Sequence, residues 1–229
     1  MITIAPWPET IAEARPLQER LAREIRLVPL PAEPAIVAGV DAAFAGDRIV
    51  AVATLFDCRT LTLLESAHEV RPVTFPYIPG YLSFREAPAM LAALGRLSRQ
   101  PDLLIVDGQG IAHPRRMGIA AFLGVVLGLP AIGSAKSRLI GEYDEPGPER
   151  GSASPLLYHG ERIGTVLRTR AGVRPLFVSP GHLITFDEAA ECVLRLAPRY
   201  RLPEPQRAAD ALSGKLKRDC AFPPEKENG

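Results

Sequence analysis

The four apolar residues Leu103–Val106 restrict the fold of this chain more than any other segment. A run this short favours a strand that is buried on both faces, which is typical of the centre of a parallel sheet. Segments with apolar residues at helical spacing precede and follow it, at residues 86–97 and 118–127. Strands that alternate with helices predict an α/β fold.

The N-terminal part of the chain reads as a β-meander. An amphipathic helix at residues 11–27, which Pro16 either kinks or begins, and a Pro-rich linker come first. Strands are predicted over residues 35–44, 49–56 and 60–73. We therefore expect a mixed β-sheet flanked by helices.

The C-terminal part continues the alternation of strands and helices. The predicted elements are a strand at 131–132, a hairpin at 156–167 that turns at His159-Gly160-Glu161, a strand at 176–178 and helices at 187–196 and 203–217. A polar loop at 139–154 and a short loop at 179–182 connect them. No repeat or boundary is visible, so we expect a single domain over residues 1–229. Within it, residues 1–34 form the N-terminal helix and linker, and residues 210–229 form a frayed tail.

Composition and charge limit the function. The chain has 229 residues, of which 47% are hydrophobic and 23% charged, as in a globular domain with one well-buried core. The net charge is +1, from 27 basic and 26 acidic residues. Because non-specific nucleic-acid binders are usually more basic, any binding of nucleic acid must depend on a local patch.

The cysteines and the N-terminus indicate the compartment. Cys58, Cys192 and Cys220 are widely spaced, which indicates neither a disulfide framework nor a zinc site. The N-terminus has no signal-peptide pattern, and no segment approaches the roughly 18 apolar residues of a membrane helix. We expect a soluble, cytoplasmic protein with no membrane partner.

Acidic residues interrupt or end the predicted strands. Asp41 lies within an apolar strand, and Asp107 directly follows Val106. A buried carboxylate needs a cation or several hydrogen bonds, and the C-terminal ends of parallel strands form the usual ligand crevice. With Glu86, these acids are candidate ligands for a hard cation such as Mg²⁺. Each acid alone has a structural interpretation, as a bend, a turn or a helix start; the two strand acids together favour a metal.

The segment Pro76-Tyr77-Ile78-Pro79-Gly80 is stiff, because two prolines fix their own φ angles and restrict the residues before them. A tyrosine on such a loop loses little entropy when it stacks on a base or wedges beside one. Gly80 allows the backbone to approach a ligand closely. From the residues alone, a tyrosine presented to a base and a Pro-rich turn whose tyrosine lies on the surface are about equally well supported.

Glycines and basic residues follow the central strand. Gly108 and Gly110 leave backbone N–H groups free to face an anion, with Arg115 and Arg116 further on. His113 is a candidate for phosphate contact or acid–base catalysis, and an ordinary loop histidine is the alternative.

Two later residues carry weaker signals. Lys136 is a candidate phosphate contact, although composition alone favours a solvated charge, and His182 could orient water or remain a structural loop histidine. No G-x-S-x-G elbow, Walker loop or H-E-x-x-H motif occurs. The remaining chemistry is metal-assisted hydrolysis of a phosphodiester.

The ordered motifs of the chain resemble those of the endonuclease V family. Their blocks run in the family's order from about Val37 to about Ala209. They are Val37-Ala38-Gly39-Val40-Asp41, Phe75-Pro76-Tyr77-Ile78-Pro79-Gly80, Phe84-Arg85-Glu86, Val106-Asp107-Gly108-Gln109-Gly110, His113-Pro114-Arg115, Ile132-Gly133-Ser134-Ala135-Lys136-Ser137-Arg138, Val178-Ser179-Pro180-Gly181-His182 and Arg201-Leu202-Pro203-Glu204-Pro205. So many ordered blocks are far more specific than any single motif.

The resemblance implies a ribonuclease H-like fold and Mg²⁺-dependent cleavage, with Mn²⁺ as a substitute. The implied substrate is a DNA strand that contains a deaminated base, chiefly deoxyinosine. The implied cut lies at the second phosphodiester bond 3′ to the lesion and leaves 3′-hydroxyl and 5′-phosphate ends without removing the base. Extruding a base costs a few kcal/mol, and a stiff aromatic wedge offsets part of that cost.

The resemblance also implies roles for individual residues. Asp41, Glu86 and Asp107 match the metal-binding acids; Lys136 matches the catalytic-site lysine and His182 a histidine near the metal and the scissile phosphate. The family's strand wedge, which fills the gap left by the extruded base, is matched by Pro76, Tyr77, Ile78 and Pro79. The residues that match the substrate-binding region are Tyr77, Gly80, Leu82, Gly108, His113, Gly133 and Leu139.

Three alternatives to this function remain open. The first is an endonuclease specific for inosine-containing RNA, which contacts to a 2′-hydroxyl would distinguish. The second is a non-catalytic inosine-binding module, which would not need a set of carboxylates. The third is a small-molecule phosphohydrolase, for which Tyr77 would have no purpose. We expect the protein to act as a monomer.

Overall fold

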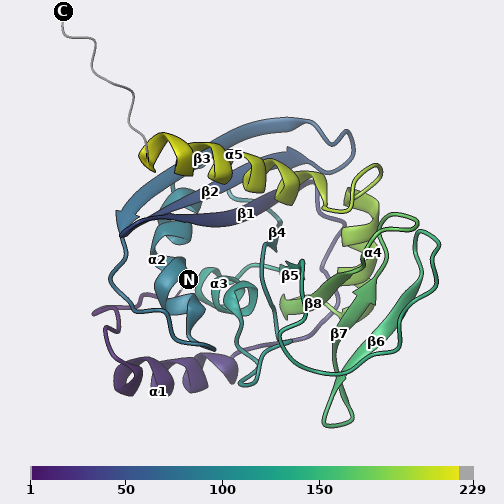
Figure 1. The fold of residues 1–229 in the computed structure, drawn as a ribbon, viewed down its shortest axis with the longest axis horizontal. Helices are drawn as coiled ribbons and strands as arrows, with labels where there is room; N and C mark the ends of the chain where they lie inside the picture. Colours follow the sequence, from purple (N-terminus) through teal and green to yellow (C-terminus); the bar gives the residue numbers. More distant parts are fainter. Residues whose placement is uncertain (1, 222–229) are drawn as a thin grey trace, which may run out of the picture.

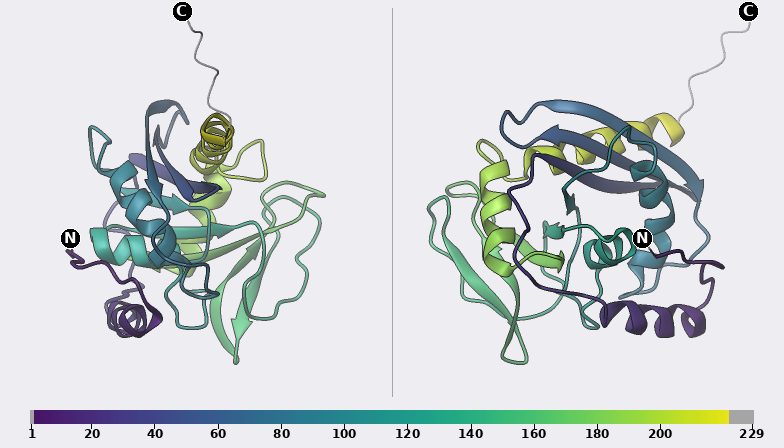
Figure 2. Two further views of the ribbon diagram at one scale, coloured as in Figure 1. Left: turned by 60° about the vertical axis from the view of Figure 1, so that its left-hand side comes forward. Right: turned by 180° about the vertical axis from the view of Figure 1, so that it is seen from behind.

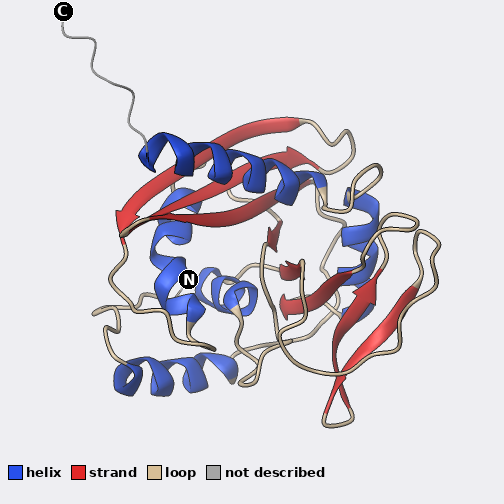
Figure 3. Cartoon of the chain, in the orientation of Figure 1, coloured by secondary structure: helices blue, strands red, loops and turns tan. Residues whose placement is uncertain are grey.

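The computed structural model describes residues 2–221, which form one eight-stranded sheet with helices on both faces (Figures 1 and 3). The strands are β1 (Ile36–Ala45), β2 (Arg48–Asp57), β3 (Leu63–Pro72), β4 (Leu103–Val106), β5 (Ala131–Ala135), β6 (Ala153–Tyr158), β7 (Glu161–Leu167) and β8 (Leu176–His182). The helices are α1 (Ile11–Ala22), α2 (Leu82–Leu94), α3 (Ile119–Leu127), α4 (Phe186–Leu196) and α5 (Glu204–Ala221). No helix in residues 2–221 has both the length and the apolar character needed to cross a membrane.

The strand order is β3-β2-β1-β4-β5-β8-β7-β6. β1, β2 and β3 form the predicted antiparallel meander, and β4 pairs in parallel with β1 on one side and β5 on the other. β6 and β7 form the predicted hairpin, whose turn residues His159 and Gly160 have φ angles of 52° and 79°. The mixed sheet with a central parallel strand is therefore confirmed.

The central strand separates two apolar layers. Leu104 and Val106 pack with the side chains of α1, α2 and α3, whereas Leu103 and Ile105 pack with those of α4 and α5. This alternation is the period-2 pattern of a strand that is buried on both faces. Figures 1 and 2 show α1 and α5 on opposite sides of the molecule.

α2 begins about one turn earlier than predicted, at Leu82, and ends earlier, at Leu94 instead of Leu97. With the predicted start, Pro88 would lie in the first turn; in the structure it lies further inside the helix. A proline there cannot donate to the carbonyl four residues earlier. The indole Nε1 of Trp7 donates to that oxygen, on Phe84, at 2.9 Å, so a distant residue supplies the missing hydrogen bond.

Other predicted bounds also change. α1 ends at Ala22 instead of Leu27 and begins at a capping box of Thr10 and Glu13, so Pro16 does not mark its start. β5 continues to Ala135 instead of Ile132. Residues 179–182, predicted as a loop, are the end of strand β8.

The C-terminal segment is more ordered than expected. α5 continues to Ala221, so residues 210–221 of the predicted frayed tail are helical, and residues 222–229 lie outside the described part of the chain. The first turn of α5 lies against β1 because Gly39 has no side chain: a Cβ there would be 2.1 Å from the carbonyl oxygen of Pro205. The same oxygen accepts a hydrogen bond from the hydroxyl of Thr54 at 2.9 Å.

Candidate active site

Two neighbouring strands direct their acids to the same face of the sheet. Val40 pairs with Val106, and the backbone N–H of Asp107 donates to the oxygen of Val40 at 2.9 Å. Val40 and Val106 face the layer of α1 to α3. Since side chains alternate along a strand, Asp41 and Asp107 point to the opposite face, where α5 lies.

α5 adds two residues that the sequence did not indicate. Carboxylate oxygens of Asp41, Asp107 and Asp210 lie within 4.8 Å of one another. The hydroxyl of Ser213, one turn further along α5, donates to Oδ2 of Asp41 and also contacts the carbonyl oxygen of Asp210 at 3.0 Å. The structure thus brings the two predicted strand acids together and adds a third acid.

The electrostatics of this group favour a cation. The pKa of Asp41 is raised to about 6, mainly by burial; the Ser213 hydrogen bond opposes this rise, and the charge of Asp107 contributes to it. A set of three carboxylates supplies the hard oxygen ligands that Mg²⁺ and Mn²⁺ prefer. The donor set therefore fits a hard divalent cation.

Glu86 approaches the same acids from the other face. It lies on α2 and is only 8% exposed. Burial raises its pKa to about 8, and the charges of Asp41 and Asp107 add to the effect. Glu86 is therefore near the two strand acids, although it does not belong to the group of three aspartates whose oxygens lie within 4.8 Å.

Lys136 lies at the carboxylate group, directly after the end of β5. Its Nζ is 2.6 Å from Oδ2 of Asp107 and also contacts Oδ1 of Asp210. Burial alone would lower the pKa of Lys136, but the hydrogen bonds to these two carboxylates outweigh burial and raise it. The side chain therefore carries its positive charge next to the acids.

His182 lies away from the acids, which corrects its expected place near the metal. β8 is antiparallel to β5, so His182 pairs with Ala131, the first residue of β5, whereas Lys136 follows the last. At about 3.3 Å per residue, roughly 13 Å of strand separates the two ends. The Nδ1 of His182 accepts a hydrogen bond from the backbone N–H of Arg26 at 3.3 Å. Burial and the charge of Arg26 lower its pKa.

A pocket of about 120 Å³ is formed by segments next to those that carry the acids. Its lining includes many residues that the resemblance placed at the lesion. It is lined by Tyr77, Ile78, Pro79, Gly80, Leu82, Ser83, Gln109, His113, Gly118, Ile119 and Leu139. Ser83 precedes Glu86 by one helical turn, and Gln109 follows Asp107 by two residues, so the pocket and the acids share α2 and the segment after β4.

The wedge loop has a defined conformation. The backbone N–H of Tyr81 donates to the oxygen of Ile78 at 3.0 Å, and Gly80 has a φ of 80°, which together describe a type II turn with Pro79 and Gly80 at its centre. Phe75 anchors the loop, being 1% exposed. Tyr77 is 72% exposed at the mouth of the pocket, which suits a wedge better than a side chain packed on the surface.

Two glycines of the predicted substrate region lie behind the pocket lining. A Cβ on Gly108, whose φ is 150°, would be 2.5 Å from the side chain of Ile119. A Cβ on Gly133 would be 2.2 Å from the backbone N of Gly110. Both therefore permit close packing of the segment after β4, and the predicted Leu82 and Leu139 form the pocket lining itself.

His113 is a neutral side chain in this pocket. It is 4% exposed, and burial followed by the positive charge of Arg115 lowers its pKa to about 4. Its Nδ1 accepts a hydrogen bond from the backbone N–H of Arg115 at 3.1 Å. A neutral imidazole held in this way lacks the positive charge that would suit binding of a phosphate.

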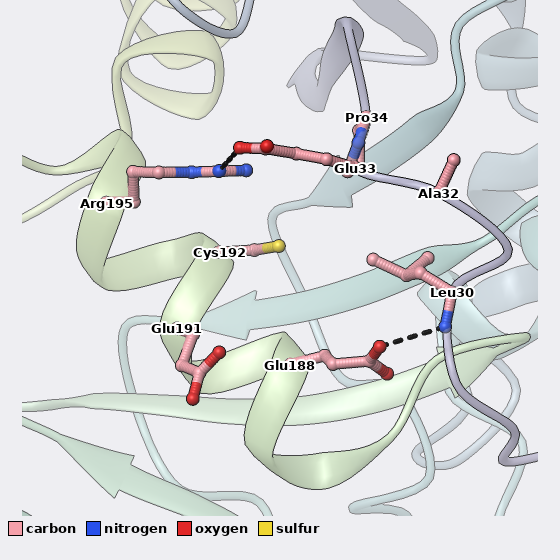
Figure 4. A pocket seen from close by; sticks show the side chains of 8 residues that line it. All are labelled: Leu30, Ala32, Glu33, Pro34, Glu188, Glu191, Cys192 and Arg195. Atoms are coloured by element: carbon pink, nitrogen blue, oxygen red, sulfur yellow. Dashed lines mark hydrogen bonds and ion pairs between the residues drawn. The ribbon is translucent and has the colours of Figure 1, made fainter.

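A larger pocket of about 440 Å³ lies away from these residues, between the linker after α1 and α4 (Figure 4). Glu33 pairs there with Arg195, and the backbone N–H of Leu30 donates to Glu188 at 2.9 Å. None of the predicted site residues lines it. The carboxylate group and the pocket of Tyr77 are therefore the candidate site.

A sequence profile of endonuclease V matches residues 19–211. The chain belongs to the endonuclease V family. An endonuclease V from Geotalea uraniireducens (strain Rf4) is 60% identical over 208 residues, which cover 91% of this chain and 89% of that protein. The predicted membership of this nuclease family is thus confirmed.

Solved structures of the family share the fold. The endonuclease V of Streptomyces avermitilis superposes with a TM-score of 0.90 at 44% identity, over 95% of this chain and 97% of that chain. An endonuclease V from Ciona intestinalis, in complex with a 24mer DNA containing an inosine followed by a ribo-adenosine, gives a TM-score of 0.80 at 25% identity, over 93% of this chain and 100% of that one. The predicted ribonuclease H-like fold is confirmed.

Asp210 and Ser213 are the residues that sequence reasoning missed. Asp210 directly follows Ala209, where the resemblance becomes weak, and lies inside a predicted helix. An acid on a polar helix is common, and no spacing links it to Asp41 or Asp107. Only the docking of α5 on β1 reveals its neighbours.

Proposed function

We propose that this protein is a Mg²⁺-dependent endonuclease that cuts DNA strands containing deaminated bases, chiefly deoxyinosine. The cut lies at the second phosphodiester bond 3′ to the lesion and leaves 3′-hydroxyl and 5′-phosphate ends. The observation that carries the proposal is that the carboxylate group and the pocket of Tyr77 share the segment after β4, where Asp107 precedes the pocket residue Gln109 by two positions. One chain supplies both parts, so we propose that it acts as a monomer.

Asp41, Asp107 and Asp210 would hold the cation, for which Mg²⁺ and its substitute Mn²⁺ fit the oxygen donors. A divalent cation bound there lowers the pKa of water and neutralises charge on the phosphodiester. Glu86, whose pKa burial raises to about 8, lies near the aspartates, and a cation bound there would favour its ionised form. Ser213 fixes the orientation of the Asp41 carboxylate through its hydrogen bond.

Lys136 would contact the scissile phosphate. Its ammonium lies at Asp107 and Asp210 and keeps its charge. A fixed cation at this place stabilises the negative charge that develops on phosphate oxygens in the transition state. His182 has no role in this proposal.

The pocket would hold the extruded base while Tyr77 occupies its place in the stack. Hypoxanthine presents an O6 acceptor and an N1–H donor, and the pocket offers the neutral His113, Ser83 and Gln109. The inosine-containing DNA bound by the Ciona intestinalis relative supports this class of substrate.

Cleavage of inosine-containing RNA is the second candidate. The DNA bound to that relative has a ribo-adenosine after the inosine, so a 2′-hydroxyl follows the lesion in that complex. A non-catalytic inosine-binding module is a weaker candidate, because three clustered carboxylates do not serve base recognition.

The test is a cleavage assay on end-labelled DNA and RNA, each with one inosine, in single- and double-stranded form with Mg²⁺. We expect a single cut at the second 3′ phosphodiester of the inosine strand, which Asp107→Asn abolishes. Equal cutting of undamaged strands, or no metal-dependent cutting, would refute the proposal. Faster cutting of the RNA would make the second candidate the better one.

A further inference from the structure

Gln18 of α1 is fully buried and reaches the pocket of Tyr77 from behind. Its Nε2 lies 3.0 Å from the carbonyl oxygen of Gly80 and 3.3 Å from that of Met117. Gly80 belongs to the wedge loop, and Met117 precedes Gly118 in the opposite lining of the pocket. One amide therefore bridges the two walls.

Arg115 completes the connection. Its Nε donates to Oε1 of Gln18 at 2.5 Å, and its Nη2 donates to the oxygen of Gly80 at 2.6 Å. The guanidinium also lies over the ring of Tyr81, 4.3 Å from its centroid. The carbonyl oxygen of Gly80 thus accepts hydrogen bonds from both side chains.

These contacts act on the turn that presents Tyr77. The oxygen of Gly80 belongs to the peptide unit between the third and fourth residues of the type II turn, and Gly80 itself has the φ of 80° that the turn requires. A Cβ on Gly80 would be 2.7 Å from Nη2 of Arg115, so the guanidinium packs directly against the turn. Rotation of the turn would break both hydrogen bonds.

Burial of Gln18 has a cost that packing alone would not justify. An apolar side chain could fill this position on α1 without desolvating an amide. Each polar atom of the Gln18 side chain has a partner, and all three partners belong to the pocket or its support. The polarity of this position therefore serves the pocket and not the helix.

We propose that Gln18 and Arg115 are positioning residues for lesion recognition, which hold the wedge loop and the opposite pocket wall at a fixed separation. The N-terminal helix is then part of the substrate-recognition apparatus. This role depends on the proposed function, because it specifies how the same pocket discriminates inosine. Neither residue touches the carboxylate group.

The test compares Gln18→Met, which preserves size and removes the hydrogen bonds, with Leu21→Ala, which weakens the packing of the same helix and leaves the network intact. Leu21 is 1% exposed, and its apolar side chain cannot hydrogen-bond to Gly80. We expect Gln18→Met to raise KM for the inosine strand about tenfold, with kcat and Mn²⁺ affinity unchanged. Leu21→Ala should lower the melting temperature and leave KM unchanged.

A second variant and a second measurement keep the test independent of folding and of the reaction. Gln18→Glu retains the acceptor for Arg115 but loses both donors, so it should raise KM like Gln18→Met. Hydrogen exchange requires no substrate: the amides of residues 77–83 should exchange faster in both Gln18 variants and not in Leu21→Ala. Failure of the wild-type protein to cut inosine would refute the proposed function and leave this exchange result interpretable.

Two outcomes would overturn the positioning role. One is an unchanged KM in both Gln18 variants. The other is an equal change in KM and in exchange at residues 77–83 for Leu21→Ala and Gln18→Met, because general loosening of α1 would then explain both.

Discussion

Ser213 on α5 donates a hydrogen bond to Asp41 on β1, across 172 positions of the chain. This contact joins the C-terminal helix to the strand that begins the sheet. It opposes the effect of burial on the Asp41 carboxylate, whose pKa is still raised to about 6. The last described helix is therefore part of the candidate site.

Asp210→Asn should weaken Mn²⁺ binding by at least about tenfold, because it removes one of three clustered carboxylates. Asp219→Asn is the matched control, since Asp219 lies on the same helix and is exposed. Calorimetric titration with Mn²⁺ measures both. Equal affinities for the two variants would exclude Asp210 from the metal site.

Gly39→Ala should move α5 away from β1 and destabilise the fold by about 1–3 kcal/mol, the usual cost of overpacking. The new Cβ would be 2.1 Å from the oxygen of Pro205. Mn²⁺ affinity should fall with it, because Asp210 and Ser213 would move. In Gly214→Ala, the control on α5, the nearest atom to the new Cβ is 3.8 Å away, so stability and affinity should not fall. Urea unfolding and Mn²⁺ titration test both variants.

Tyr77→Ala should weaken binding to inosine-containing DNA about tenfold or more and leave Mn²⁺ affinity unchanged. The expectation follows from about 1–3 kcal/mol for stacking of an aromatic side chain on a base. Tyr200→Ala removes another exposed tyrosine, 46% exposed, and should not affect binding. Fluorescence anisotropy of labelled inosine-containing DNA measures the DNA affinity, with both tyrosine substitutions made in the catalytically inactive Asp107→Asn protein. A similar loss for both tyrosines would argue against a wedge.

His113 should make the stability of the protein depend on pH. Its pKa in the folded protein is about 4, below the ordinary value of about 6.5 expected on unfolding. Between these pH values the unfolded chain binds more protons than the folded protein does. The contribution of His113 to the free energy of unfolding is therefore complete above about pH 6.5 and is lost as the pH falls towards 4. The loss reaches about 3 kcal/mol.

Urea unfolding of the wild-type protein and His113→Gln at pH 7 and pH 4.5 checks this prediction. The variant should lose less stability over this interval than the wild-type protein does. An identical pH dependence would show that His113 does not remain neutral in its pocket.

Local patterns predicted much of the architecture. The period-2 burial of Leu103–Val106 and the Asp that follows it depend on residues adjacent in the chain. The type II turn at Pro79 and Gly80 is equally local, because its conformation follows from one proline and one glycine. For the same reason, Asp41, Asp107 and Tyr77 could be selected as candidate site residues from the order of the amino acids.

Non-local contacts account for the misplaced elements. Pro180 and Gly181 indicate a loop by composition, yet β5 provides a partner for this segment, and the pairing is irregular between Ala131 and Ile132. A bulge lets such residues remain in a strand. That extension of β8 places His182 at the far end of β5 from the carboxylates.

The strand pattern, the family and the two strand acids follow from the amino-acid order, because each depends on short-range periodicity or on motifs that stay contiguous. Packing of the folded chain decided that Asp210, Ser213 and Gln18 lie at the candidate site and that His182 does not. Helix docking and strand register bring together residues far apart in the chain, and both depend on distant surfaces such as the bare backbone of Gly39. The strand Leu103–Val106 therefore predicts the position of Asp107, and α5 adds Asp210 to the carboxylate group.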